Sequence, residues 1–138
     1  MTIQGRCHCG NISFELETAL GDEDVRPRSC DCSFCSMHGA KTWSDPEGHA
    51  TIRVADARAL ARYRFGLEVT DFLVCRTCGA YAGAVTLADD GTWATLNLRL
   101  TRFRDVDASG AHYGGESADE RNARRRRMWT PTAIVGSE

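Results

Sequence analysis

Seven cysteines, gathered in three short clusters, constrain this 138-residue chain more than any other feature. The clusters are Cys7-x-Cys9, Cys30-x-Cys32-x-x-Cys35 and Cys75-x-x-Cys78. Cysteines can serve as small buried hydrophobic side chains, as disulfides or as metal ligands. Disulfides are disfavoured, because the count is odd and neighbours two positions apart reach disulfide geometry only with strain. Spacings this short, repeated three times, are typical of metal sites, and we predict that the cysteines are metal ligands.

Two cysteine pairs that lie far apart in sequence can share one ion. On an extended strand residues i and i+2 point to the same side, so Cys7 and Cys9 can present two thiolates together. A tight turn brings Cys75 and Cys78 together, and Gly79 supplies the backbone freedom that such a turn needs. We therefore predict a closed, structural four-cysteine zinc site that staples the first strand to the middle of the chain.

The middle cluster predicts a different kind of site. Cys30, Cys32 and Cys35 can form a three-sulfur tripod, which leaves a fourth position for water, substrate or another side chain, as in catalytic zinc sites. Soft thiolates favour zinc, so we expect two zinc ions per chain. A second partition stays open, in which Cys30 and Cys32 pair with Cys75 and Cys78 and the other three cysteines are left over.

The apolar pattern predicts a mostly β domain of short antiparallel strands. Strands are expected at 11–16, 52–54, 61–65, 72–74, 81–87 and 95–100. Asp90-Gly91 is a strong hairpin signal between the last two of these strands. The return strand is expected to place Leu96, Leu98 and Leu100 on one face.

The C-terminal part has a different pattern. The polar, glycine-containing segment 105–115 is predicted to be a loop. Ser117-x-x-Glu120 matches a capping box and predicts a short helix over 118–128. Because the length suits one core and no boundary is visible, we expect a single domain over 1–138, with its core at about 5–103 and a C-terminal loop and helix over 104–138.

Composition excludes several classes of partner. A formal net charge of −2 argues against a generally cationic surface, so we do not expect a nucleic-acid partner. No apolar run approaches the roughly 20 residues of a membrane span, and the opening residues lack the apolar stretch of a secretory signal. We therefore expect no membrane partner and a cytoplasmic location, where thiols stay reduced.

Three segments occur in an order that resembles a known family. They are 5–10 (GRCHCG), 30–35 (CDCSFC) and 72–79 (FLVCRTCG). Together they resemble the signature of the glutathione-dependent formaldehyde-activating enzyme and centromere protein V family, and the resemblance runs over about 5–103. It implies the Mss4-like β-tent fold, a structural zinc at the four-cysteine group and an active-site zinc at the tripod.

The resemblance also implies an activity. The reaction associated with the family is condensation of glutathione with formaldehyde to S-hydroxymethylglutathione, which is classed as carbon–sulfur lyase chemistry. The expected partner is then a small-molecule thiol or aldehyde such as glutathione, and the chain would be a monomer or homodimer. Relatives often carry a basic residue directly after the third tripod cysteine, where this chain has Ser36, so another thiol or aldehyde can be the substrate. A non-catalytic zinc-binding interaction module is the alternative function, but it does not require a tripod with an open position.

Residues near the clusters carry further hypotheses. His38, three residues after Cys35, can supply a fourth ligand or a proton relay at a catalytic tripod. His8 is expected to point away from the metal, because it alternates with two ligands on a strand. Asp31 and Ser33 can hydrogen-bond the tripod sulfurs, or they can be solvated loop residues.

Two other features have an open interpretation. The run Arg124–Arg127 can bind a phosphate or carboxylate, or it can be the solvated face of the terminal helix. Trp43 follows the tripod closely and is a candidate for the wall of a pocket.

Overall fold

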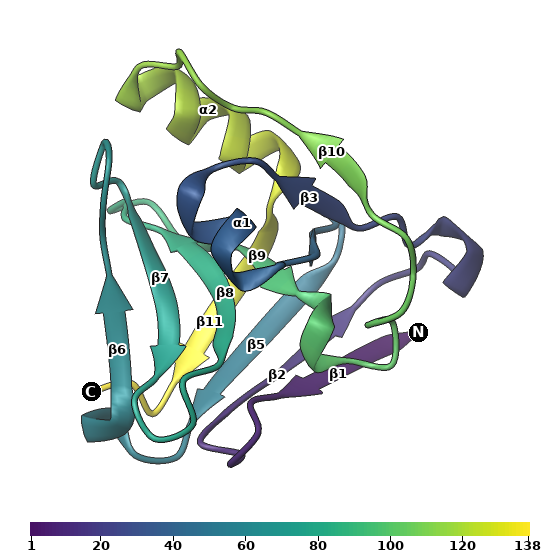
Figure 1. The fold of residues 1–138 in the computed structure, drawn as a ribbon, viewed down its shortest axis with the longest axis vertical. Helices are drawn as coiled ribbons and strands as arrows, with labels where there is room; N and C mark the ends of the chain where they lie inside the picture. Colours follow the sequence, from purple (N-terminus) through teal and green to yellow (C-terminus); the bar gives the residue numbers. More distant parts are fainter.

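Eleven short strands pair into one sheet in the computed structural model, which describes residues 1–138 (Figure 1). The strands are β1 (Thr2–Arg6), β2 (Ile12–Glu17), β3 (Arg28–Cys30), β4 (Thr42–Trp43), β5 (His49–Val54), β6 (Leu60–Tyr63), β7 (Thr70–Cys75), β8 (Tyr81–Thr86), β9 (Trp93–Asn97), β10 (Ser109–Ala111) and β11 (Thr130–Val135). The α-helices are α1 (Ser33–His38) and α2 (Ala118–Met128). The predicted mostly β fold with a short C-terminal helix is confirmed.

The sheet branches at β9. One edge of β9 pairs with β8, which continues through β7 to β6. The other edge is shared by two strands, with β11 at Trp93 and Ala94 and β4 at Leu96 and Asn97. One branch then runs through β11, β5, β2 and β1, and the other through β4, β3 and β10.

The C-terminal part contributes more to the sheet than the sequence indicated. β11 lies between β5 and β9 and is parallel to β5, so the core extends beyond the predicted limits of 5–103. The predicted loop over 105–115 contains β10, which pairs in parallel with β3. Both strands were missed because a parallel partner is set by long-range pairing that short sequence patterns do not report.

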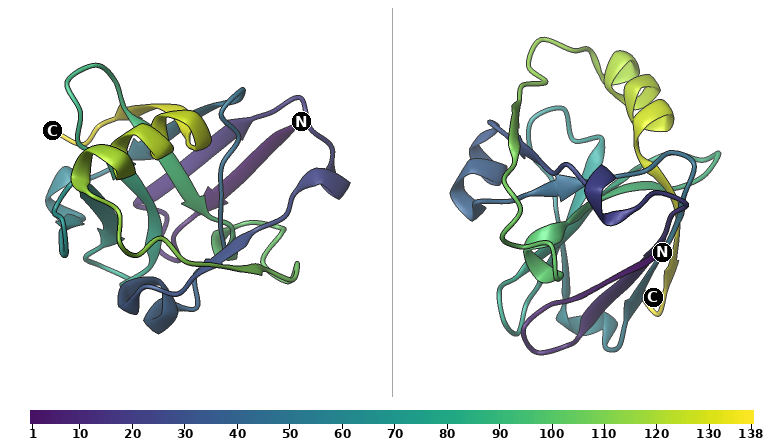
Figure 2. Two further views of the ribbon diagram at one scale, coloured as in Figure 1. Left: turned by 90° about the horizontal axis from the view of Figure 1, so that it is seen from above. Right: turned by 90° about the vertical axis from the view of Figure 1, so that its right-hand side faces the viewer.

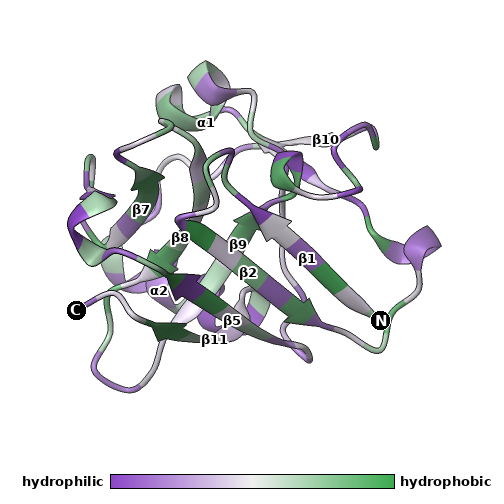
Figure 3. Ribbon diagram, turned by 90° about the horizontal axis from the view of Figure 1, so that it is seen from below, coloured by the Kyte–Doolittle hydropathy of each residue, from purple (hydrophilic) through white to green (hydrophobic).

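Strands β1, β2 and β5 have one buried and one solvated face, as their alternating hydropathy in Figure 3 shows. Strands β7 and β8 are instead buried on both faces. One face, with Leu73 and Val85, belongs to the main core of 19 buried residues. The opposite face, with Phe72 and Ala84, belongs to a second apolar cluster that includes Cys35 and is packed by the other two tripod cysteines.

A register shift between β7 and β8 decides which face Tyr81 occupies. Leu73 pairs with Gly83, but Val74 pairs with Tyr81, so Ala82 is an extra residue on β8. Such a bulge reverses the alternation beyond it. Tyr81 therefore lies with Ala84 in the second cluster, whereas Ala82 lies in the main core.

Several local predictions were wrong in detail. Cys7 and Cys9 do not lie on a strand, because β1 ends at Arg6 and the chain turns there, with Gly10 at a φ of 86°. The return strand ends at Asn97, and Leu98–Leu100 form a 3₁₀ turn in which the Arg99 N–H donates to the Asn97 side chain.

Three further elements differ from the sequence interpretation. The expected strand at 61–65 is β6, which begins at Leu60 and ends at Tyr63. Trp43 packs in the main core instead of lining a pocket. Helix α1 was not predicted, because its N-cap is Cys32, whose sulfur accepts a hydrogen bond from the Cys35 N–H.

Helix α2 was predicted correctly, capping box included. The Ser117 hydroxyl accepts from the Glu120 N–H at 3.1 Å, and the Glu120 carboxylate accepts from the Ser117 N–H at 3.2 Å. In Figures 1 and 2 the helix lies across one end of the molecule, beyond β3 and β10. Neither α-helix combines the length and the apolar character that crossing a bilayer would take.

A substitution at Gly83 can test how tightly β8 packs against β9. A Cβ atom at Gly83 would lie 2.7 Å from the Thr95 carbonyl oxygen and 3.1 Å from Leu96 Cδ2. Gly83→Ala should therefore lower the free energy of unfolding by about 1–3 kcal/mol, measured by urea denaturation. Gly110→Ala is the matched control, because a Cβ there meets no atom within 4 Å. Equal stability of the two variants would contradict this packing.

Candidate metal centres and the adjoining pocket

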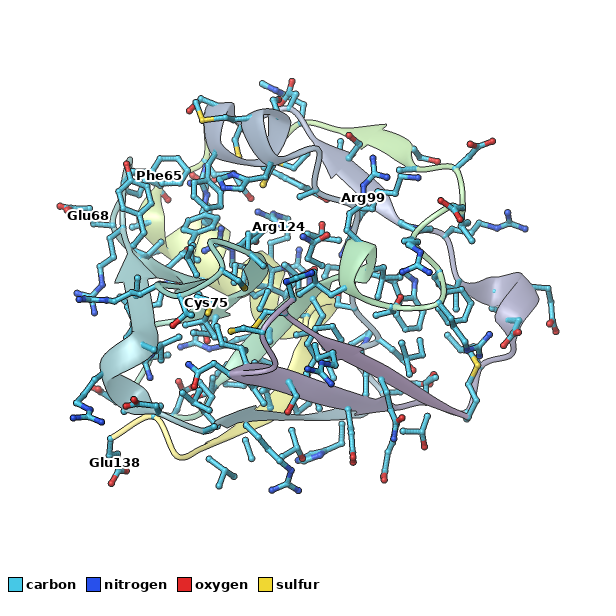
Figure 4. The ribbon with its side chains drawn as sticks, turned by 60° about the horizontal axis from the view of Figure 1, so that its bottom comes forward. Phe65, Glu68, Cys75, Arg99, Arg124 and Glu138 are labelled. Atoms are coloured by element: carbon cyan, nitrogen blue, oxygen red, sulfur yellow. The ribbon has the colours of Figure 1, made fainter.

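The first cysteine group joins two turns that are distant in sequence. Cys7 and Cys9 come from the β1–β2 turn, whereas Cys75 ends β7 and Cys78 lies in the turn that follows. Their four sulfurs all lie within 4.8 Å of one another. Figure 4 labels Cys75, which lies inside the molecule with other sulfur atoms beside it.

The spacing of these sulfurs suits a tetrahedral ion. The Cys7 and Cys9 sulfurs are 3.8 Å apart, and those of Cys9 and Cys75 are 3.5 Å apart. Four thiolates at about 2.3 Å from a metal have sulfurs about 3.8 Å apart. The group can therefore close around one metal ion with little movement.

Backbone N–H groups and neighbouring thiols set the charge of this group. The Ile12 N–H donates to the Cys7 sulfur at 3.3 Å, and the Cys78 N–H donates to the Cys75 sulfur at 3.5 Å. The backbone N–H of Cys9 is the largest influence on Cys78 and, against burial, lowers the pKa of its thiol to about 6. Such donors favour the thiolate, which is the form that binds metal.

The second group is local to one segment of the chain. Cys30 ends β3, Cys32 caps α1 and Cys35 lies in its first turn. The three sulfurs lie within 4.8 Å of one another. The Cys35 thiol, as hydrogen-bond donor, lowers the pKa of Cys30 to about 5, while the same hydrogen bond and burial raise that of Cys35. The structure thus brings the cysteines together in the first of the two partitions considered above, and each group can hold a metal ion.

A cavity of about 360 Å³ opens beside the tripod. All three tripod cysteines line it, together with five aromatic residues, Phe65, Phe72, Tyr81, Tyr113 and Trp129. Positive charge comes from four arginines that also line the cavity, Arg28, Arg121, Arg124 and Arg125. The site therefore combines a group of soft donors, an apolar wall and a cationic wall.

Helix α2 supplies most of the cationic wall. Positions 121, 124 and 125 share one face at helical spacing, whereas Arg126 is exposed and pairs with Asp90 at 2.9 Å. Arg124, labelled in Figure 4, donates to both oxygens of Glu116, at 2.8 and 3.0 Å. Arg121 donates to the same carboxylate at 3.3 Å. Arg124 and Arg125 of the run therefore line the cavity, whereas Arg126 and Arg127 lie on the solvated face of the helix.

Arg125 is the buried member of the run, only 7% exposed. One of its nitrogens, Nη1, donates to the Thr70 hydroxyl, and its guanidinium lies 4.3 Å from the centre of the Trp129 ring. Burial, together with the cations Arg124 and Arg121, lowers the pKa of Arg125 to about 10. The side chain is still a cation at neutral pH.

Tyr81 is a buried phenol in the cavity lining, and both the tripod sulfurs and Arg125 act on it. It is 3% exposed and lines the cavity, and its hydroxyl makes no hydrogen bond to the protein. Burial, and then the sulfurs of Cys35, Cys32 and Cys30, raise the pKa of Tyr81 well above its usual value. The phenol is therefore a neutral hydrogen-bond donor that faces the cavity.

Of the polar candidates near the cysteines, only Asp31 lines the cavity. His38 is exposed, and its Nδ1 lies 2.9 Å from the Phe34 carbonyl oxygen, so the structure does not bring it to the tripod sulfurs. His8 is exposed, as expected, although in a turn. The Asp31 carboxylate pairs with His112 at 2.8 Å, and Ser33 is exposed at the start of α1.

Sequence reasoning missed the aromatic wall and part of the cationic one. The spacing of positions 121, 124 and 125 could have placed three arginines on one helix face. Tyr81 had no such signal, because the bulge that turns it into the cavity is invisible in the apolar pattern.

No known family model matches the chain, and no curated protein matches it. The crystal structure of a Rhodobacter sphaeroides protein, a structural genomics target, matches at 30% sequence identity with a TM-score of 0.54. The match covers 78% of this chain and 99% of that chain. The chain belongs to the same family as that protein. The Rhodobacter sphaeroides relative supports the fold, and no activity is stated for it.

The two cysteine groups should differ in their effect on stability. Cys9→Ser should remove one bound metal ion and lower Tm by roughly 10 °C or more, because that group joins residues 66 positions apart. Cys32→Ser, the matched variant in the local tripod, should remove the other ion with a much smaller change in Tm. Elemental analysis and circular dichroism measure both effects. A folded spectrum that is unchanged after verified metal removal would contradict the structural role of the first group.

Proposed function

We propose that this chain is a zinc-dependent enzyme of the carbon–sulfur lyase type, which condenses a thiol such as glutathione with formaldehyde or another aldehyde. The observation that carries the proposal is that the tripod sulfurs line a cavity with room for a small molecule. A three-sulfur group with an open position suits catalysis, whereas a closed group of four suits a structural ion. The resemblance to the glutathione-dependent formaldehyde-activating enzyme and centromere protein V family supports the same reading, and with it the Mss4-like fold.

The donor sets favour zinc at both groups. All seven ligands are sulfurs, and soft thiolates select zinc over magnesium or calcium. At the tripod, zinc would supply a Lewis acid and a place where a thiol binds as thiolate.

The protein's own residues then account for the rest of the reaction. The thiol sulfur bonds to the aldehyde carbon, the carbonyl π bond opens onto oxygen, and the proton lost by the thiol ends on that oxygen. Tyr81 can donate a hydrogen bond to the oxygen as its charge develops, because its hydroxyl is free and faces the cavity. Phe72 and Trp129 keep bulk water away from the reacting groups.

The test is the rate of hemithioacetal formation by the zinc-loaded protein, with glutathione and ¹³C-formaldehyde followed by NMR exchange spectroscopy. The wild type should exceed the spontaneous rate, and Cys35→Ser should not. Tyr81→Phe should lower the catalysed rate roughly 10²-fold, as expected for loss of one donor to a developing oxyanion. Tyr63→Phe is the matched control, because Tyr63 is 51% exposed and lies outside the cavity lining.

Full activity in Cys35→Ser would contradict the role of the tripod. No acceleration by the wild type, with glutathione or smaller thiols and with formaldehyde or larger aldehydes, would contradict the enzyme. The chain would then be better described as a zinc-binding interaction module.

A further inference from the structure

Arg125 is a buried cation without a carboxylate partner. The other arginines that line the cavity are engaged, since Arg121 and Arg124 share Glu116 and Arg28 donates to the Ser44 hydroxyl at 2.8 Å. Arg125 has only the Thr70 hydroxyl and the face of Trp129. A buried charge is costly unless it is paired, so this arrangement calls for an anion.

The free atoms of Arg125 have a defined geometry. Nη1 is bound to Thr70, whereas Nε is buried and has no hydrogen-bond partner, and no protein atom accepts from Nη2. Nε–H and Nη2–H are the two parallel donors of one guanidinium edge, and that edge matches the two oxygens of a carboxylate.

The surroundings define the rest of the ligand. The cavity is small, about 360 Å³. The Arg125 guanidinium lies over the Trp129 ring, and Phe72, Tyr81 and Trp129 form one apolar cluster with the tripod cysteines. Glu116 is the carboxylate that acts on Arg125 from a distance, but it is already paired with Arg121 and Arg124. A ligand with a largely apolar body and one acidic group would satisfy both walls.

We infer that the free Nε–Nη2 edge of Arg125 binds a carboxylate, and that the substrate of this site is a compact thiol or aldehyde with one carboxylate on an apolar body. The nature of the reacting end rests on the proposed function, whereas the carboxylate site rests on Arg125 alone. Arg125 is then a specificity-determining residue that orients the ligand within the cavity.

The test measures binding without turnover. The zinc-loaded full chain is titrated calorimetrically with 3-phenylpropionate and with its neutral isostere 3-phenylpropionamide. The acid should bind about 10–100-fold more tightly than the amide, as expected for charge-assisted hydrogen bonds. Equal affinities, or no measurable binding of the acid at millimolar concentration, would overturn the inference.

Variants assign the preference to one side chain. Arg125→Gln should abolish the preference for the acid, and Arg126→Gln should leave it intact, because Arg126 is exposed on the same helix and pairs with Asp90. Should Arg125→Gln fail to fold, Arg125→Lys keeps the charge but not the two parallel donors, and should bind the acid about ten-fold more weakly. An undiminished preference in a folded Arg125 variant would overturn the inference.

The two proposals can fail separately. Preference for the acid without any hemithioacetal formation would support the carboxylate site and contradict the enzyme. Catalysis with glutathione together with equal binding of acid and amide would support the enzyme and overturn the carboxylate site.

Discussion

Crowding of thiol sulfurs is the physical constraint on which the rest of this structure depends. The chain has two groups of sulfurs, four from two distant turns and three within one short segment. Within each group the sulfurs lie within 4.8 Å of one another. Thiolates at such distances repel unless a cation neutralises them, and thiols at such distances compete for protons, as the opposite pKa shifts of Cys30 and Cys35 indicate. A bound metal ion neutralises the thiolates and takes the place of the thiol protons, and at the first group it also cross-links two distant turns.

The sheet explains why one group faces a cavity. Because β7 and β8 are buried on both faces, a second apolar cluster forms behind the main core, and the tripod packs at its edge. The bulge at Ala82 turns Tyr81 into that cluster, and α2 closes it with Arg124 and Arg125. Soft donors, a neutral phenol and a buried cation thereby meet around one small space, although they come from segments far apart in the chain.

Local patterns predicted some of this well. The cysteine spacings and the capping box at Ser117 each depend on a few neighbouring residues, so the grouping of sulfurs and helix α2 could be predicted from the sequence. The cavity could not be predicted from the sequence, because its lining depends on how distant segments pair. Strand β11 is recognisable only once β5 and β9 flank it, and the direction of Tyr81 depends on a bulge against β7. His38 was a candidate tripod residue because it follows Cys35 closely in sequence, but its Nδ1 lies beside the Phe34 carbonyl oxygen.

Anomalous diffraction at the zinc absorption edge from crystals of the full chain would show whether both cysteine groups hold zinc. Two peaks are expected, one about 2.3 Å from the sulfurs of four cysteines and one at the same distance from the three tripod sulfurs, with an open side toward the cavity. A disulfide within either group, or no peak at the tripod, would contradict this expectation.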